Sequence, residues 1–218
     1  MLKKKHILII GGNGFLGQRV VDALSDKKYL VSVFDLNIDY KKIKPNKIKH
    51  LFKYNILKNE DLDKALSKEK WDYIIHLAAF IGKGNGLLQA ANENLDKAIN
   101  TNVTGFANLL SKLKNKNSKI IWSSSAVVFG NETIYKDGVV NENASLQPFT
   151  NYGITKLMAE EVANYYIRKY KMNITGIRFP IIIGPGLGYR GVAAGISDMA
   201  YLSRSEEHTS ELQSPLNL

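Results

Sequence analysis

Residues 6–17 are HILIIGGNGFLG, an apolar run followed directly by glycines at positions 11, 14 and 17. The apolar run predicts a buried strand, and the glycines predict a tight turn into a helix that begins near Phe15. Glycine is needed where the chain turns sharply and where the backbone must approach a ligand. Unpaired N–H groups at the start of a helix attract phosphates, so this stretch predicts a dinucleotide-binding loop rather than only a tight turn.

Beyond this loop, short apolar segments alternate with helical segments as far as about residue 184. The expected strands are His6–Ile10, Leu30–Phe34, Ile48–Phe52, Tyr73–Leu77, Ile120–Ser123 and Ile174–Phe179. The expected helices are Phe15–Ser25, Glu60–Ser67, Asn92–Lys114 and Tyr152–Tyr170. Because parallel strands need long crossover connections, this alternation predicts an α/β fold with a doubly wound parallel sheet of the Rossmann type.

An acidic residue closes the second expected strand. Asp35 lies eighteen positions after Gly17, where a carboxylate would accept hydrogen bonds from the adenosine ribose hydroxyls of a cofactor. A carboxylate there repels a 2′-phosphate, and the first cations that follow it are Lys41 and Lys42. We therefore expect NAD rather than NADP. The alternative is a solvated aspartate that only ends a strand.

A tyrosine and a lysine at positions i and i+4 begin the last expected helix. Tyr152 and Lys156 lie one turn apart on one helical face. The phenol has a reference pKa of about 10, and a nearby ammonium favours the phenolate. The pair therefore predicts a general acid/base that moves a proton on or off a carbinol. Ser125, with Ser124 as the alternative, ends the strand before this helix and is expected to hydrogen-bond the reacting oxygen.

These features, taken in order, resemble the extended short-chain dehydrogenase/reductase superfamily, in particular the NAD-dependent epimerase/dehydratase family and enzymes of the UDP-glucose 4-epimerase type. The resemblance covers residue 5 to about residue 190. It rests on the three-glycine loop, His76–Ala79, Asn102–Gly105, Ser123–Gly130, Tyr152 with Lys156, Arg178–Pro180 and Gly184–Gly186. The resemblance implies an NAD-binding domain over residues 1–190.

The resemblance also implies roles for individual residues. Tyr152 would be the catalytic acid/base, Lys156 would orient the nicotinamide ribose, and Ser125 would be the hydroxyl partner. The residues expected to bind the cofactor are Gly11, Asn13, Gly14, Phe15, Leu16, Gly17, Asp35, Asn55, Ile56, Leu77, Ala78, Ala79, Asn102, Ser123, Tyr152, Lys156 and Phe179. No metal site is expected.

Some positions depart from relatives. Ala126 and Val127 stand where sugar-nucleotide 4,6-dehydratases carry an Asp-Glu pair, which argues against that elimination. Pro180 replaces an asparagine that contacts substrate phosphates in several UDP-sugar epimerases. The hypothesis is an NAD-dependent epimerase that acts on a nucleotide sugar or related sugar. The alternatives are a net sugar dehydrogenase or reductase and, in another class, a non-catalytic dinucleotide-binding module.

Charge and composition constrain the partners. The formal net charge is +10, but the basic residues are mostly scattered lysines, so we expect no nucleic-acid partner. Apolar runs stay well short of the ~20 residues that span a bilayer, and there is no cysteine for disulfides or thiolate sites. We expect a cytoplasmic protein. By resemblance, a homodimer would form through the helices at 92–114 and 152–170.

The last part of the sequence follows a different pattern. Residues 191–203 are expected to begin a substrate-binding lobe that is largely missing, and residues 204–218 resemble the translation of a sequencing-library adapter. We expect a chain that binds NAD but shows little or no turnover, with an open substrate cleft and exposed apolar surface where the lobe would pack.

Overall fold

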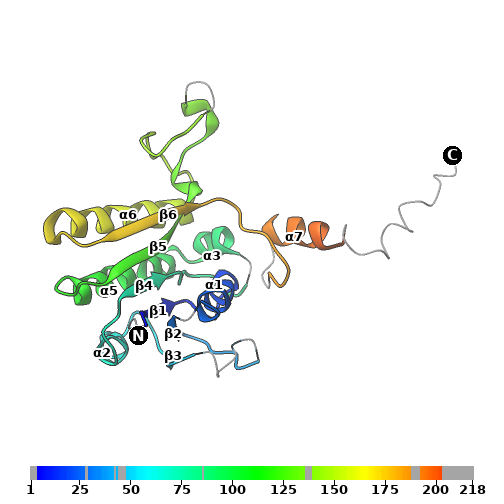
Figure 1. Ribbon diagram of the computed structural model, residues 1–218. Helices are drawn as coiled ribbons and strands as arrows, with labels where there is room; N and C mark the ends of the chain where they lie inside the picture. The colour runs from blue at the N-terminus through cyan, green and yellow to red at the C-terminus, as the bar shows by residue number, and fades with distance from the viewer. Residues whose placement is uncertain are drawn as a thin grey trace.

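The computed structural model describes residues 4–27, 29–41, 43, 48–84, 86–135, 139–187 and 192–202. Within these residues, six strands form one sheet in the order β3-β2-β1-β4-β5-β6, and every neighbouring pair is parallel. The strands are β1 (His6–Ile10), β2 (Leu30–Asp35), β3 (Leu51–Lys53), β4 (Tyr73–His76), β5 (Lys119–Ser125) and β6 (Ile174–Phe179). Figure 1 shows helices packed around this sheet.

The principal helices are α1 (Phe15–Ser25), α2 (Asn59–Ser67), α3 (Leu87–Glu93), α4 (Leu95–Ile99), α5 (Gly105–Leu113), α6 (Asn151–Tyr170) and α7 (Val192–Leu202). A π-helical turn, η2 (Asn100–Thr104), and two 3-10 turns, η3 (Ala126–Val128) and η4 (Glu132–Ile134), complete the described elements.

The predicted doubly wound α/β fold is confirmed. The bounds of β1, β6 and α1 are those expected from the sequence, whereas β3 begins at Leu51 rather than at Ile48. The difference is one of boundary, because Lys49 N–H already donates to the carbonyl oxygen of Val31 in β2 at 2.7 Å. The strand order reverses between β1 and β4, the arrangement that opens a crevice in doubly wound sheets.

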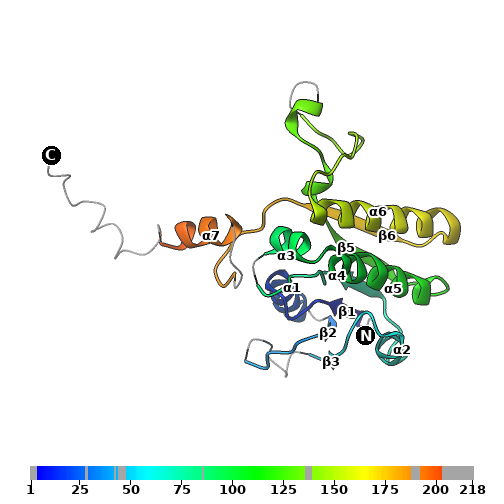
Figure 2. The ribbon, with the colours of Figure 1, turned by 180° about the vertical axis from the view of Figure 1, so that it is seen from behind.

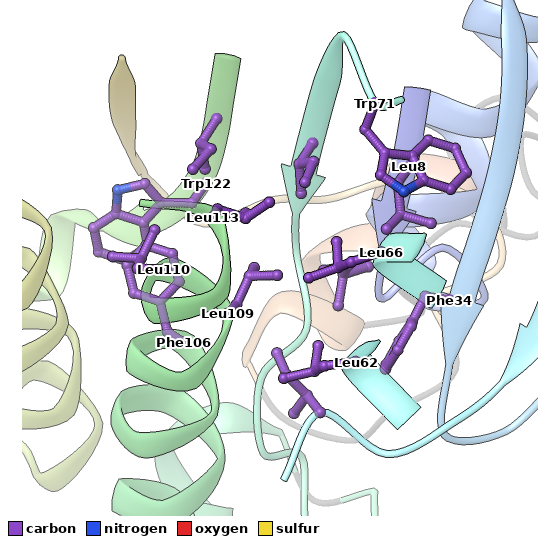
Figure 3. Close-up of a cluster of buried hydrophobic side chains, with 14 of the residues drawn as sticks. Leu8, Phe34, Leu62, Leu66, Trp71, Phe106, Leu109, Leu110, Leu113 and Trp122 are labelled. Atoms are coloured by element: carbon purple, nitrogen blue, oxygen red, sulfur yellow. The ribbon is translucent and has the colours of Figure 1, made fainter. Parts of the chain in front are cut away.

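The two faces of the sheet carry different helices. On one face, α1 packs through Val21 against Ile7 and Ile9 of β1 and neighbouring apolar side chains of β2. Leu8 and Ile10 point to the other face, where they join a larger cluster from α2, α5 and α6. Figure 3 shows part of this cluster, and Figures 1 and 2 show α3, α5 and α6 grouped together. The larger core therefore supports α6, the helix that carries Tyr152.

The prediction of one continuous helix over Asn92–Lys114 is wrong. The structure breaks it at Asn94, whose backbone angles of φ −148° and ψ 77° leave the helical region. The π-helical turn η2 then interrupts the remainder and carries Asn102. A π-helical turn widens a helix locally and is frequent at functional sites, but it leaves the apolar periodicity almost unchanged. The hydrophobic pattern therefore could not locate it.

Apolar side chains are exposed at and beyond β6. Ile177 is 41% exposed and lies beside Ser123 in the register of β5 and β6, on the face opposite Trp122, which lies against Gly176. Ile181 and Ile183 follow it and are also exposed. This agrees with the exposed apolar surface expected near a substrate lobe, although the lobe itself stays a prediction.

The end of the chain is only partly described. The expected lobe segment, 191–203, contains α7, and the expected tail, 204–218, lies outside the described residues. A search of the described helices for one with the length and hydropathy of a membrane span finds none.

Candidate functional site

The predicted site residues gather at one edge of the sheet, where the carboxyl ends of the parallel strands meet. Asp35 ends β2, Ser125 ends β5 and Phe179 ends β6, while Gly11 and Leu77 directly follow β1 and β4. Doubly wound sheets bind ligands in the crevice at this edge, where the strand order reverses. The sequence-predicted residues therefore come from five different strands to the place where a ligand is expected.

The loops after β1 and β4 meet so closely that Gly11 has no room for a side chain. Gly11 has φ +83°, and a Cβ placed on it would lie 2.5 Å from the backbone nitrogen of Ala78. A Cβ on Gly17 would lie 2.1 Å from the carbonyl oxygen of Gly11, so α1 packs directly on the turn. Gly14, between them, is exposed. Close packing therefore explains the glycines at positions 11 and 17, and Gly14 between them is open to solvent.

The start of α1 is suited to an anion. Among the described residues, none caps α1 through its side chain, and no acidic residue lies in its first turn, which begins with Phe15 and Leu16. Backbone N–H groups in this position carry partial positive charge and need acceptors. Gln18 steadies the turn, because its Nε2 donates to the carbonyl oxygen of Asn13 at 2.7 Å. The pyrophosphate of a dinucleotide fits this arrangement.

Asp35 is bonded to the same loop. Its Oδ2 accepts from the N–H of Asn13 at 2.9 Å, and its Oδ1 accepts from the N–H of Asn37 at 3.1 Å. Burial raises the pKa of Asp35, and these backbone hydrogen bonds oppose the rise. Each carboxylate oxygen has a further lone pair, so Asp35 can still accept bonds from ribose hydroxyls.

α6 places Lys156 beside Tyr152 in a nearly dry environment. The helix is capped by Thr150, whose Oγ1 accepts from the N–H of Gly153 at 3.0 Å. Lys156 is 3% exposed, and its Nζ donates to the carbonyl oxygen of Ser123 at 2.7 Å. The same Nζ lies 5.6 Å from the centre of the Tyr152 ring. An ammonium at this position favours the phenolate form of the tyrosine.

Burial lowers the pKa of Lys156 to about 8, and the carboxylate of Glu160 opposes that shift. His76, at the end of β4, is also buried. Burial, together with the charge of Lys156, lowers the pKa of His76 to about 3. The imidazole therefore stays neutral near neutral pH and adds no second buried cation beside Lys156.

The two serines that were candidates for the hydroxyl partner differ in their surroundings. Ser124 is 3% exposed, and its Oγ donates to Oε1 of Glu160 at 2.5 Å. The Oγ of Ser125 makes only long contacts of 3.5 Å, to the N–H of Val127 and the carbonyl oxygen of Phe179. Contacts of this length are weak. Among the described residues, the hydroxyl of Ser124 is therefore bonded to a carboxylate, whereas that of Ser125 has weak contacts; the role of Ser125 as hydroxyl partner stays a prediction.

Asn102 connects three segments around the site. Its Oδ1 accepts from the N–H of Phe80 at 2.8 Å, and its Nδ2 donates to Oγ1 of Thr155 at 2.9 Å. Thr155 in turn donates to the carbonyl oxygen of Tyr152 at 2.8 Å. Asn102 is 3% exposed, so it links the loop after β4 to the first turn of α6. Direct contact between Asn102 and a cofactor stays a prediction.

The residues predicted near the adenine have structural contacts of their own. Oδ1 of Asn55 accepts from the N–H of Leu57 at 2.9 Å, which shapes the entry to α2. Ile56 is 6% exposed and belongs to the main core. Their adenine contacts stay predictions. The other predicted cofactor residues after β4 and in β5 are half-buried at the same edge: Leu77, Ala78, Ala79 and Ser123.

Two further polar contacts lie at this edge, and no sequence motif predicts them. Arg178 of β6 pairs with Glu160 of α6 at 2.8 Å, and Nη2 of Arg19 donates to the carbonyl oxygen of Pro185 at 2.6 Å. Glu160 lies four positions after Lys156, a spacing that could have drawn attention to it. The contact of Arg19 joins segments far apart in sequence and has no local signature.

A methyl group at Gly11 is expected to distort the glycine loop. In Gly11→Ala, the positive φ alone costs roughly 1–2 kcal/mol for a residue with a Cβ, and the contact with Ala78 adds to it. We expect a lower midpoint of urea unfolding and loss of dinucleotide binding in calorimetry.

Gly84→Ala is the matched control for this variant. Gly84 also has positive φ, at +94°, but a Cβ there meets nothing within 4 Å. The difference between the two variants isolates the close approach of the loops after β1 and β4. Equal unfolding midpoints in the two variants would contradict that steric explanation.

A sequence model of the NAD dependent epimerase/dehydratase family matches residues 7–208. The chain belongs to this family. UDP-glucuronate 4-epimerase 3 of Arabidopsis thaliana is 30% identical over 207 residues, a match that covers 89% of this chain and 44% of that protein. Membership of the epimerase/dehydratase family confirms the family that the sequence motifs resemble.

Solved structures of similar proteins share the fold. UDP-glucuronic acid 4-epimerase from Bacillus cereus, in complex with NAD, superimposes with a TM-score of 0.68 at 27% identity and covers 83% of this chain and 58% of that chain. A monomeric L-threonine 3-dehydrogenase from a metagenome superimposes with a TM-score of 0.70 at 28% identity. The match covers 81% of this chain and 54% of that chain. The chain thus spans between 44% and 58% of the length of these three relatives.

Proposed function

We propose that this member of the epimerase/dehydratase family is an NAD-dependent epimerase that acts on a nucleotide sugar or related sugar by transient oxidation at a carbinol carbon. The observation that carries the proposal is the buried ammonium of Lys156 beside Tyr152, at the sheet edge where the glycine loop opens. The 4-epimerase relatives that act on UDP-sugars support the choice of substrate class. UDP-glucuronate and UDP-glucose are therefore the probe substrates.

Three groups of residues would hold the cofactor. The glycine loop and the first turn of α1 would bind the pyrophosphate, Asp35 the adenosine ribose, and Lys156 the nicotinamide ribose. When bound, NAD supplies reversible acceptance of a hydride from the carbinol carbon. The half-buried residues after β4 would line its path.

The protein's own groups would handle the proton. Tyr152 takes the hydroxyl proton of the carbinol, and the charge of Lys156 lowers the free energy of the phenolate. Ser125 would hydrogen-bond the same oxygen as it becomes a carbonyl oxygen. Inversion then requires that the keto sugar turn, so that the hydride would return to the opposite face of the carbonyl carbon while Tyr152 returns the proton to the oxygen. These roles are the ones that the sequence analysis expects, and each stays a proposal.

An elimination is less well supported by the residues next to Ser125. Ala126 and Val127 form the turn η3 there and bring no carboxylate to the site. The acids that the 4,6-dehydratases carry at these positions are absent from the sequence. A simple oxidation and reduction of the carbinol is therefore favoured over loss of water.

A net dehydrogenase is the second candidate function. The similarity to an L-threonine 3-dehydrogenase at 28% identity favours it, and it needs the same Tyr152, Lys156 and Ser125. The two functions differ in their products. Reduced cofactor that accumulates with a released ketone indicates a dehydrogenase, whereas an epimer without net reduced cofactor indicates an epimerase.

Calorimetric titration with NAD and then NADP tests the cofactor assignment. The protein is expected to prefer NAD, and Asp35→Ala is expected to weaken NAD binding by about tenfold or more, the effect of a lost hydrogen bond to a charged group. The affinity for NADP should fall less, because the substitution also removes the repulsion between the carboxylate and the 2′-phosphate. The variant should therefore narrow the preference between the two nucleotides.

Asp22→Ala is the control for the lost charge. Asp22 is an exposed acid on α1, outside the loop that Asp35 supports, so its removal should leave both affinities near the wild-type values. If the folded wild-type protein binds neither nucleotide, the proposed function of this chain is wrong.

The expected homodimer stays a prediction. Ile154, Met158 and Tyr165 of α6 are exposed, as residues of a helix-helix interface would be in a single chain. Exposure of this kind does not identify a partner.

A further inference from the structure

Glu160 lies at the centre of a polar cluster between α6 and the strands β5 and β6. Ser124 of β5 donates to its Oε1 at 2.5 Å, and Arg178 of β6 donates to both carboxylate oxygens, from Nε at 2.9 Å and from Nη2 at 2.8 Å. The side chains of Glu160 and Arg178 are 12% and 24% exposed. A guanidinium that contacts both oxygens fixes the direction of the carboxylate as well as its position.

Arg178 is itself held from two other sides. Its guanidinium carbon lies 4.9 Å from the centre of the Phe129 ring, and its Nη1 donates to the carbonyl oxygen of Glu142 at 3.3 Å. Arg178 therefore cannot follow Glu160 away from β6 without losing both contacts. The carboxylate is kept one helical turn from Lys156, on the same helix.

Lys156 and Glu160 are anchored to consecutive residues of β5. The ammonium of Lys156 donates to the carbonyl oxygen of Ser123, and the carboxylate of Glu160 accepts from the hydroxyl of Ser124. Any displacement of Glu160 along the sheet would therefore strain the end of the strand that positions Lys156.

Several charged or titratable groups face Lys156. Tyr152 and Glu160 lie on its own helix, His76 comes from β4, and Arg178 from β6 lies behind Glu160. β5 contributes the Ser123 carbonyl oxygen and the Trp122 ring, 5.7 Å from Nζ. Burial keeps His76 neutral, so it neither attracts nor repels the ammonium strongly. Glu160 is the acidic side chain among these groups. Its charge raises the pKa of Lys156 against the effect of burial.

We propose that Glu160, held by Arg178 and Ser124, is a positioning residue that keeps Lys156 charged and bonded to the Ser123 carbonyl oxygen beside Tyr152. Without Glu160, Lys156 is a buried cation whose one described polar partner is a carbonyl oxygen, and it releases its proton at lower pH. Tyr152 then loses the positive charge that favours its phenolate. This catalytic consequence rests on the proposed function, whereas the coupling between Glu160 and Lys156 does not.

The test is an NMR titration of the side-chain carbon and nitrogen resonances of Lys156, in protein with isotope-labelled lysine and without nucleotide. Lys156→Arg assigns the signal. The wild-type protein is expected to show a pKa of about 8 for Lys156. Glu160→Gln is expected to lower that pKa by on the order of one pH unit, the effect of a removed neighbouring charge.

Glu161→Gln is the matched control, because it removes the same charge from the next residue, whose carboxylate accepts from Asn164 instead. Its Lys156 titration should follow the wild type. A Glu160→Gln titration that coincides with the wild type, or an equal shift in Glu161→Gln, overturns the proposal.

Glu160→Gln leaves Arg178 without its carboxylate, which can prevent folding. In that case Glu160→Gln combined with Arg178→Gln replaces the ion pair by two amides, and its Lys156 pKa is compared with that of Arg178→Gln alone, so that the two proteins differ only in the charge of Glu160. The titration contains no nucleotide, so its outcome is separate from that of the NAD calorimetry, which tests the proposed function.

Discussion

Tyr152→Phe is expected to lower the turnover of a nucleotide sugar by a factor of about 10² to 10⁴, the usual contribution of a positioned general acid or base. The substitution removes one oxygen and leaves the buried ring packed with Ala91 and Ala98, so the fold should be kept. NAD affinity should change little, because Asp35 and the glycine loop are untouched. The measurements are the rate of epimer formation from the probe substrates and the calorimetric affinity for NAD.

Tyr165→Phe provides the comparison on the same helix. Tyr165 is 43% exposed and far along α6 from Lys156, so the loss of its hydroxyl should leave turnover unchanged. Wild-type turnover in Tyr152→Phe would contradict the proton-transfer role. A wild-type protein that binds NAD but converts neither probe would agree with the low turnover expected of a chain without its substrate lobe, and the comparison of Tyr152→Phe with wild type is then made in a chain that carries this lobe.

The fold could be predicted because local pattern and global topology agree. The run His6–Ile10 with its glycines specifies a strand, a turn and a helix within twelve residues, and the structure has those elements at the predicted bounds. The region around Asn102 could not be predicted in the same way. Its geometry depends on Phe80 and Thr155, which are remote in sequence and have no effect on hydrophobic periodicity.

The candidate site also contains both local motifs and contacts between residues that are remote in sequence. Tyr152 with Lys156 and the glycine spacing are local motifs, so the sequence alone is enough to predict their roles. The sequence alone cannot distinguish Ser124 from Ser125, because the hydrogen bond from Ser124 to Glu160 is visible only in the structure. The pairing of Glu160 with Arg178 likewise joins α6 to β6, and no spacing rule connects a helix residue with a residue of the strand that it packs against.

Phe106→Ala is expected to destabilise the protein by about 3–5 kcal/mol, the usual effect of deleting a buried aromatic ring. Phe106 of α5 is fully buried (Figure 3), and its ring lies 5.0 Å from that of His76 and 4.7 Å from that of Trp122. Urea unfolding followed by circular dichroism measures the change.

Phe149→Ala tests whether the loss of stability in Phe106→Ala comes from the burial of the ring rather than from the removal of any phenyl ring. Phe149 is 75% exposed, so its removal should change stability by no more than about 0.5 kcal/mol. In Phe106→Ala, water that reaches His76 should also raise the pKa of His76 from about 3 toward the ordinary value, since burial is the main cause of its lowering. An NMR titration that finds the His76 pKa unchanged would mean that other core side chains close the cavity, and the loss of stability should then fall below the expected range.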